Sequence, residues 1–261
     1  MTVLAHEMRQ GRTALLLWTA AISFMLGITI LIYPEMAGQM DQISQMFADM
    51  GNFSAAFGMD QINFGEFSGY FGIECGNVLG LGGGLFASLL GINALSKEER
   101  QGTADFLLSH PVSRIRVLLE KLLSIVVKLL ILNTAVSLVS LGAMLLIGES
   151  LEAKAFLCIF LSYFLMGLVI ACLSFALSAC VRDGGLGLGI SLSLGMYFCN
   201  IISNLTEELK VLKYLTPYSF TDSAYIMEHL SLEGKYLLTT LSLSLVALLA
   251  SILYYRKKDI L

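Results

Sequence analysis

The chain carries little charge for its length. Of its 261 residues, 14% are Asp, Glu, Lys or Arg and 56% are hydrophobic, and the mean hydropathy is +0.78. An ordinary soluble domain has about 25% charged residues. Because so few charges cannot cover the surface of a soluble domain of this length, the composition predicts an integral membrane protein.

Patterns typical of catalysis, metal binding and nucleotide binding are also missing. The five cysteines have no metal-ligand spacing, and the three histidines are scattered along the chain. No position satisfies GxxxxGK[ST], the phosphate-binding loop of many ATPases. We therefore expect that the chain is not an enzyme, binds no cofactor or metal, and has no nucleic acid partner.

Long apolar runs are present. A helix needs about 20 residues to cross a bilayer, and helices satisfy every backbone polar group inside lipid. We predict an all-α integral membrane protein, with one transmembrane domain over residues 1–261. Its six predicted spans are 13–33, 67–95, 117–147, 153–181, 186–204 and 236–255.

The basic residues predict the orientation of these spans. An even number of spans puts both termini on one side, and most lysines and arginines fall on that side. The positive-inside rule then makes both termini and the loop 96–116 cytoplasmic, and the loops 34–66 and 205–235 extracellular. Apolar residues at helical spacing over 40–50 predict an amphipathic helix at the outer interface, and residues 1–12 form either a surface helix or a frayed end.

Small residues recur every four positions in two spans. Gly72, Gly76, Gly80 and Gly84 form such a stripe in the second span, and residues 187, 191 and 195 repeat the spacing in the fifth. Small-residue stripes let helices approach closely in lipid. We expect these stripes to be packing surfaces, against either the same chain or a second copy.

Of the charged residues inside the predicted spans, where charge is costly, Glu74 and Lys128 lie furthest from the span ends. Counted from opposite ends of their spans, Glu74 and Lys128 reach similar depths. They are candidates for a pair that lines a translocation pathway. The alternative is that the third span begins in the cytoplasm and that Lys121 and Lys128 extend to the inner interface.

The loop between the second and third spans departs from this apolar composition. Residues 96–121 read SKEERQGTADFLLSHPVSRIRVLLEK, with both signs of charge interleaved with apolar residues. Residues 105–108 predict a short helix that Pro111 limits. Mixed charge of this kind is typical of a docking surface, where it sets partner choice.

This loop resembles the corresponding loop of ABC-2 type permeases, the membrane subunits of bacterial ABC exporters. The resemblance lies in an acidic pair, Gly-Thr, a Leu-Leu stretch, Pro-Val-Ser-Arg and a lysine, here within 98–121. It implies that the chain pairs with a second permease copy or a paralogue in the membrane, and that the pair binds two separate cytoplasmic ATPase subunits, which hold ATP and Mg. The loop, with its coupling helix, would fit a cleft on the ATPase. The residues it assigns to ATPase coupling are Glu98, Glu99, Gly102, Thr103, Phe106 and Arg114.

The resemblance also bears on cargo and location. Such permeases lie in the bacterial cell membrane and export peptides, peptide toxins, drugs, ions or lipid-linked material across it. A Met- and Phe-rich exterior favours an amphipathic or hydrophobic cargo, and a small peptide most of all. An ATP-independent secondary transporter is the competing class, but it requires paired inverted repeats, and the two halves show none.

Overall fold

The computed structural model describes residues 2–38, 51, 54, 56, 66–101, 114–181 and 185–257. Every regular element in these ranges is a helix. Six helical segments there are long and apolar enough to cross a membrane, which confirms the predicted all-α class and the six spans. The predicted amphipathic helix at 40–50 lies outside the described residues.

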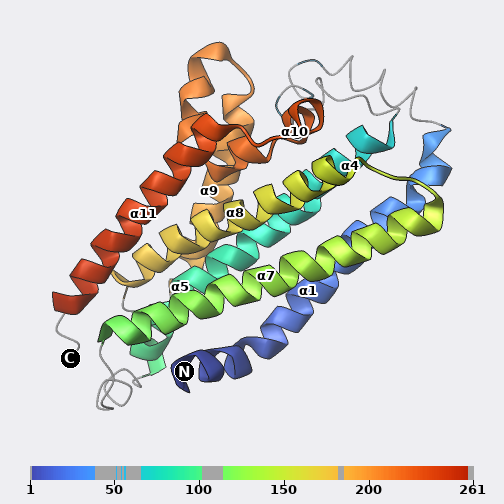
Figure 1. The fold of residues 1–261 in the computed structure, drawn as a ribbon. Helices are drawn as coiled ribbons and strands as arrows, with labels where there is room; N and C mark the ends of the chain where they lie inside the picture. The colour runs from blue at the N-terminus through green and yellow to red at the C-terminus, as the bar shows by residue number, and fades with distance from the viewer. Residues whose placement is uncertain are drawn as a thin grey trace.

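The first span belongs to one long helix. Helix α1 runs over Thr2–Ala37, and residues 2–12 form its first turns, which bend away from the rest of the helix (Figure 1). The helix begins well before the predicted residue 13, because Glu7, Arg9 and Arg12 interrupt the apolar pattern without disfavouring helix formation. Pro34 falls in the last turns of α1.

The second span is continuous but irregular. It consists of α4 (Phe67–Cys75), a π-helical stretch over Gly76–Gly83, and α5 (Gly84–Gln101). The π-helical stretch contains four glycines. Local π-helical turns are rare and frequently occur at functional sites.

The remaining spans follow the predicted order. They are α7 (Arg114–Ile147), α8 (Ala153–Ser178), α9 (Leu186–Ser203) and α11 (Gly234–Lys257). Three short helices lie between α9 and α11, namely two 3-10 helices, η3 (Glu207–Tyr214) and η4 (Pro217–Thr221), and α10 (Ser223–His229).

The spans pack as two adjoining layers. Helix α1 lies along α7, while α5 lies against α8 and α9, and α11 covers α8 (Figure 1). Phe71, Phe86 and Phe175 are fully buried between these helices. By contrast, leucines on the outer faces are open, with Leu145 73% and Leu146 79% exposed. Exposed apolar surface of this extent is typical of a face that contacts lipid or another protein.

The helix ends show where the chain enters and leaves the bundle. The first turns of α1, the end of α5, the start of α7 and the end of α11 lie at one end of the bundle (Figure 1). The short helix α10 lies at the other end. The two helix ends that flank the predicted coupling loop, at Gln101 and Arg114, thus lie at the same end of the bundle as the start of α1 and the end of α11.

Candidate functional site

The predicted coupling residues lie at or beside this end of the bundle. Glu98 and Glu99 belong to the last turns of α5, and Arg114 is the first residue of α7. Gly102, Thr103 and Phe106 lie outside the described residues. The backbone thus places the described members of the set at the two helix ends that flank the loop.

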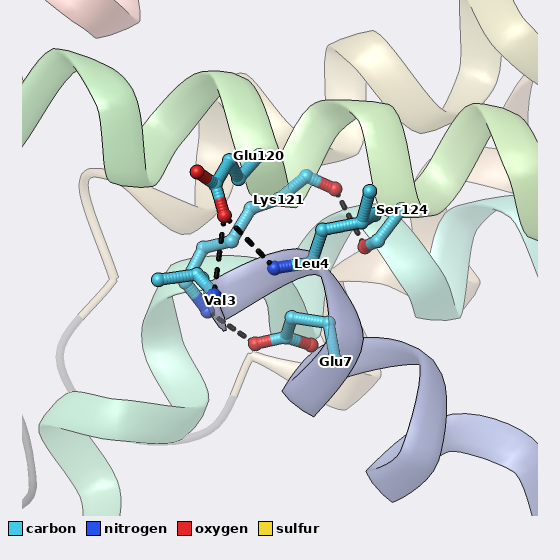
Figure 2. A network of polar contacts seen from close by, with 6 residues as sticks. All are labelled: Val3, Leu4, Glu7, Glu120, Lys121 and Ser124. Carbon is cyan, nitrogen blue, oxygen red and sulfur yellow. Dashed lines mark hydrogen bonds and ion pairs between the residues drawn. The ribbon is translucent and has the colours of Figure 1, made fainter. Parts of the chain in front are cut away.

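A polar network joins α7 to the start of α1 at this end (Figure 2). The Glu120 carboxylate accepts hydrogen bonds from the backbone N–H groups of Val3 at 3.1 Å and Leu4 at 3.0 Å. The first N–H groups of a helix have no partner within the helix and carry partial positive charge. Glu120, which also accepts a bond from Arg116 Nε at 3.0 Å, therefore caps α1 from a neighbouring helix.

The next residue of α7 forms an ion pair with α1. Lys121 Nζ lies 2.7 Å from Glu7 Oε1, and its side chain is 3% exposed. Ser124 donates to the Lys121 carbonyl oxygen at 2.7 Å (Figure 2). Together, Glu120 and Lys121 attach the first two turns of α1 to α7, so that these two helices share one anchored end.

Lys128 lies further along the same face of α7 and is 4% exposed. Its Nζ is 2.7 Å from the position that a Cβ would take on Gly11 of α1. Both Lys121 and Lys128 are buried among α1, α5 and α7. The ion pair that holds Lys121 could not be found from the sequence, because Glu7 and Lys121 are far apart in the chain.

Glu74 and Lys128 do not form the predicted pair. The Tyr70 hydroxyl, one turn before Glu74, donates to the Thr29 carbonyl oxygen of α1 at 2.9 Å, whereas Lys128 lies against Gly11. Thr29 and Gly11 mark the two levels along α1. At 1.5 Å per residue, Glu74 and Lys128 are therefore roughly 20 Å or more apart along the helix. The depth count failed because α7 begins before the predicted span and because α1, α5 and α7 all extend beyond their apolar cores.

The glycine stripe of the second span is filled by the segment between α9 and α11. A Cβ on Gly72 would lie 2.6 Å from Ser223 Cβ of α10, and a Cβ on Gly84 would meet the Tyr218 hydroxyl of η4. A Cβ on Gly76 or on Gly80 would lie 3.6 Å from the nearest side-chain atom of Tyr163 of α8. The partner of this stripe therefore lies in the same chain.

Local sequence explains why this segment folds into short helices. The Thr216 side chain accepts a bond from the Tyr218 N–H at 3.3 Å at the start of η4, where Pro217 occupies a first-turn position that needs no N–H donor. Asp222 then caps α10 through the Ala224 N–H at 3.0 Å. A Ser223 hydroxyl bond to the Gly72 carbonyl oxygen at 3.0 Å fastens the segment to α4.

A small cavity of about 110 Å³ lies beside this contact. Its lining includes polar side chains from several helices, among them Asn77, Tyr163, Asn200 and Tyr218. Glu74 is half-buried on the adjoining helix and has no hydrogen bond or ion pair to any residue that the structure describes. Of the residues at this site, Glu74 was a candidate from the sequence, whereas Asn77, Tyr163 and Asn200 belong to no motif that the sequence shows.

Comparison with known families accounts for this architecture. The family model described as ABC-2 family transporter protein matches residues 1–260. No curated protein matches the chain. Because the match covers nearly the whole chain, this protein belongs to the ABC-2 transporter family. It is a multi-pass membrane protein and a membrane permease subunit of an ABC transporter; members of this family are not themselves the ATPases.

Proposed function

We propose that this permease subunit exports an amphipathic peptide across a bacterial cell membrane, driven by two separate ATPase subunits. The ATPases bind the segment 96–116 on the cytoplasmic side. They hold ATP and Mg, and closure of their dimer moves the attached helices so that access to the cargo alternates between the two sides.

The observation that supports this coupling is the course of the two helices that flank the segment. α5 continues through the π-helical stretch into α4, and α7 is a single helix of 34 residues. A displacement at the end of α5 is thus carried along one continuous helix to the glycines that contact Tyr218. The Glu120 and Lys121 contacts carry a displacement of α7 to α1.

A second copy of the chain, or a paralogue, supplies the other half of the transporter. The open face of α9 supports this arrangement, because a Cβ on Gly187 or Gly195 would have nothing within 4 Å. Glu74 and the cavity lined by Asn77 and Asn200 are candidates for the translocation pathway, in which unpaired polar groups inside the bundle contact the polar face of the cargo.

Substitutions that reverse or introduce a charge in the coupling segment test the proposal. Glu99→Lys or Phe106→Asp should abolish cargo export, and the ATPase should no longer co-purify, while the chain still inserts into the membrane. Glu152→Lys, at the opposite end of the bundle before α8, is the matched control and should export normally. Full export by both coupling variants would show that the segment is not the ATPase contact.

The cargo requires its own experiment. ATPase stimulation and vesicle uptake should be compared across amphipathic peptides, hydrophobic drugs, ions and lipid-linked substrates. Stimulation by peptides alone supports a peptide exporter, and stimulation by another class assigns the subunit to that cargo. Uptake that persists without ATP or the ATPase would instead indicate a secondary transporter.

A further inference from the structure

A cavity of about 370 Å³ opens between α1, α5 and α7 at the end of the bundle where α1 begins. Its charged lining combines residues from all three helices. These are Glu7 of α1, Lys97 of α5, and Lys121 and Lys128 of α7. Among the described side chains of the lining, three are lysines and one is a glutamate.

Lys128 is the lysine of this lining that forms no direct bond to a carboxylate among the described residues, although Glu7 is near enough to act on it electrostatically. It is 4% exposed, lines the cavity, and has no hydrogen bond or ion pair to any residue within the described ranges. Glu7 is already bonded to Lys121. Glu120, the other nearby carboxylate of the network, accepts the N–H groups of α1 instead.

A buried ammonium group without a partner is costly, and such a group inside a membrane protein commonly pairs with another charge. The cavity offers room for an anion beside Lys128. An anionic group placed there would receive charge-assisted hydrogen bonds, which are shorter and stronger than bonds between neutral groups.

The rest of the lining changes from charged to apolar in one direction. Along α1 the lining passes from Glu7 through Gly11 to Trp18, and along α5 it passes from Lys97 through Asn93 to Phe86. Trp18 and Phe86 contact each other, with ring centroids 5.8 Å apart. A ligand that matches both ends has an anionic head and an apolar tail.

We propose that this cavity binds the headgroup of an anionic phospholipid from the leaflet at this end of the bundle. The phosphate lies beside Lys128, and the acyl chains follow the apolar end of the cavity toward Trp18. Basic pockets between transmembrane helices are known to bind anionic headgroups. The lipid then completes the contact between α1, α5 and α7.

Thermal unfolding of the purified full-length chain in detergent tests this site. Phosphatidylglycerol should raise the unfolding midpoint in a saturable manner, and phosphatidylcholine should not. Lys128→Met should weaken the apparent affinity for phosphatidylglycerol by roughly tenfold or more, the effect of losing one hydrogen bond to a charged group. Lys128→Arg keeps the charge and should keep the binding.

Further arms distinguish a lipid bound at Lys128 from a general effect of lysine content or of phosphate. Lys154→Met, which removes a lysine from the first turn of α8 at the opposite end, should bind phosphatidylglycerol like the wild type. Lys128→Met should be at least as stable as the wild type in phosphatidylcholine, because it removes an unpaired buried charge. Inorganic phosphate alone should not reproduce the effect of the lipid.

Several results would overturn the proposal. Equal stabilisation of the wild type by both lipids, unchanged affinity in Lys128→Met, or equal stabilisation by inorganic phosphate would each contradict a lipid site here. The experiment uses no ATPase and no cargo. Its outcome is therefore independent of whether Glu99→Lys uncouples export.

Discussion

At the scale of single residues, Gly91 shows how closely the helices approach. It lies on α5, where a Cβ would meet the Ala171 carbonyl oxygen and would lie 2.9 Å from the Phe175 N of α8. Both atoms belong to the backbone of α8, so neither can move aside without displacing the helix. The contact between α5 and α8 therefore depends on the absence of a side chain at this position.

Gly91→Ala should lower the free energy of unfolding by about 1–3 kcal/mol, the usual cost of overpacking. Thermal unfolding of the purified protein in detergent measures the effect. Gly142→Ala is the control, because nothing lies within 4 Å of a Cβ there. Since alanine favours a helix over glycine by up to about 1 kcal/mol, this variant should be as stable as the wild type or more stable. The reverse order of stability would contradict the close approach of α5 and α8.

The ion pair between Glu7 and Lys121 is a second residue-scale contact. Breaking a buried pair from one side costs about 3–5 kcal/mol, whereas replacing both partners by apolar residues is often nearly neutral. We therefore expect Glu7→Leu and Lys121→Leu to be destabilising alone, and the double variant to be more stable than their sum implies, with a coupling energy of about 0.5–3 kcal/mol.

A double-mutant cycle by thermal or denaturant unfolding measures this coupling. The matched control is the pair of Lys235 and Glu233, whose atoms are 2.8 Å apart but whose lysine side chain is 56% exposed. Its coupling should be clearly smaller, because water screens exposed ion pairs. Strict additivity at Glu7 and Lys121 would show that the pair does not hold α1 to α7.

At the scale of elements, the segment from η3 to α10 packs into the bundle through a side chain that inserts between helices. Tyr218 of η4 is 4% exposed and inserts between the glycine stripe of the second span and α9, where its hydroxyl lies 3.3 Å from Ser193 Oγ. Its ring also meets the ring of Tyr197, with centroids 5.4 Å apart. Tyr218 thus fills a groove that lacks Cβ atoms, and the buried side chains of Phe220 and Ile226 hold the segment together with it.

Tyr218→Ala should release this segment from the bundle. Truncating a large buried aromatic residue costs about 3–5 kcal/mol, and the loss here falls on a short element between α9 and α11. Limited proteolysis of the purified protein should cleave within residues 205–235 much faster than in the wild type. Tyr254→Ala, at a position that is 50% exposed on α11, is the control and should leave the cleavage rate unchanged. Unchanged cleavage in Tyr218→Ala would mean that other contacts hold the segment.

The same element shows what could be predicted from the sequence. The four-residue spacing of Gly72 and Gly84 predicts a close contact, because periodicity places both residues on one helix face. It cannot predict that Tyr218 fills the contact, since the partner is set by how distant segments fold together. The six spans were predictable because each apolar run is continuous and long enough to cross a membrane.

Charged positions were less predictable for a related reason. Hydropathy marks where a helix is apolar and not where it begins, so the ends of α1 and α7 were placed too far inside. Depths counted from those predicted ends then placed Glu74 and Lys128 at similar levels in the membrane, which the structure does not show. The contacts of Lys128 with Gly11 and of Lys121 with Glu7 depend on three helices at once, and no pattern within one helix contains them.

At the scale of the whole molecule, the outer surface is strongly apolar but not uniform. On α1 and α7 it consists largely of bulky leucines, such as Leu17 and Leu145, as expected for a face toward lipid. On α9 the open residues alternate between bulky side chains and the small residues Gly187, Ser191 and Gly195. Small residues at four-residue spacing allow two helices to pack closely in lipid, so this face suits a second copy of the chain.

Bulky side chains on α9 should therefore prevent pairing without unfolding the chain. If the chain pairs with a second copy as proposed, the wild type should be dimeric in mild detergent. The double variant Gly187→Leu with Gly195→Leu should then be mainly monomeric, because the added side chains keep the two α9 helices apart. Light scattering of the purified protein measures the mass, and thermal unfolding confirms that the fold is retained. Gly142→Leu, which adds the same side chain at an equally open position on α7, should remain dimeric. If the α9 variant stays dimeric and Gly142→Leu becomes monomeric, the second copy packs against α7, and the half-transporters meet on the opposite layer of the bundle.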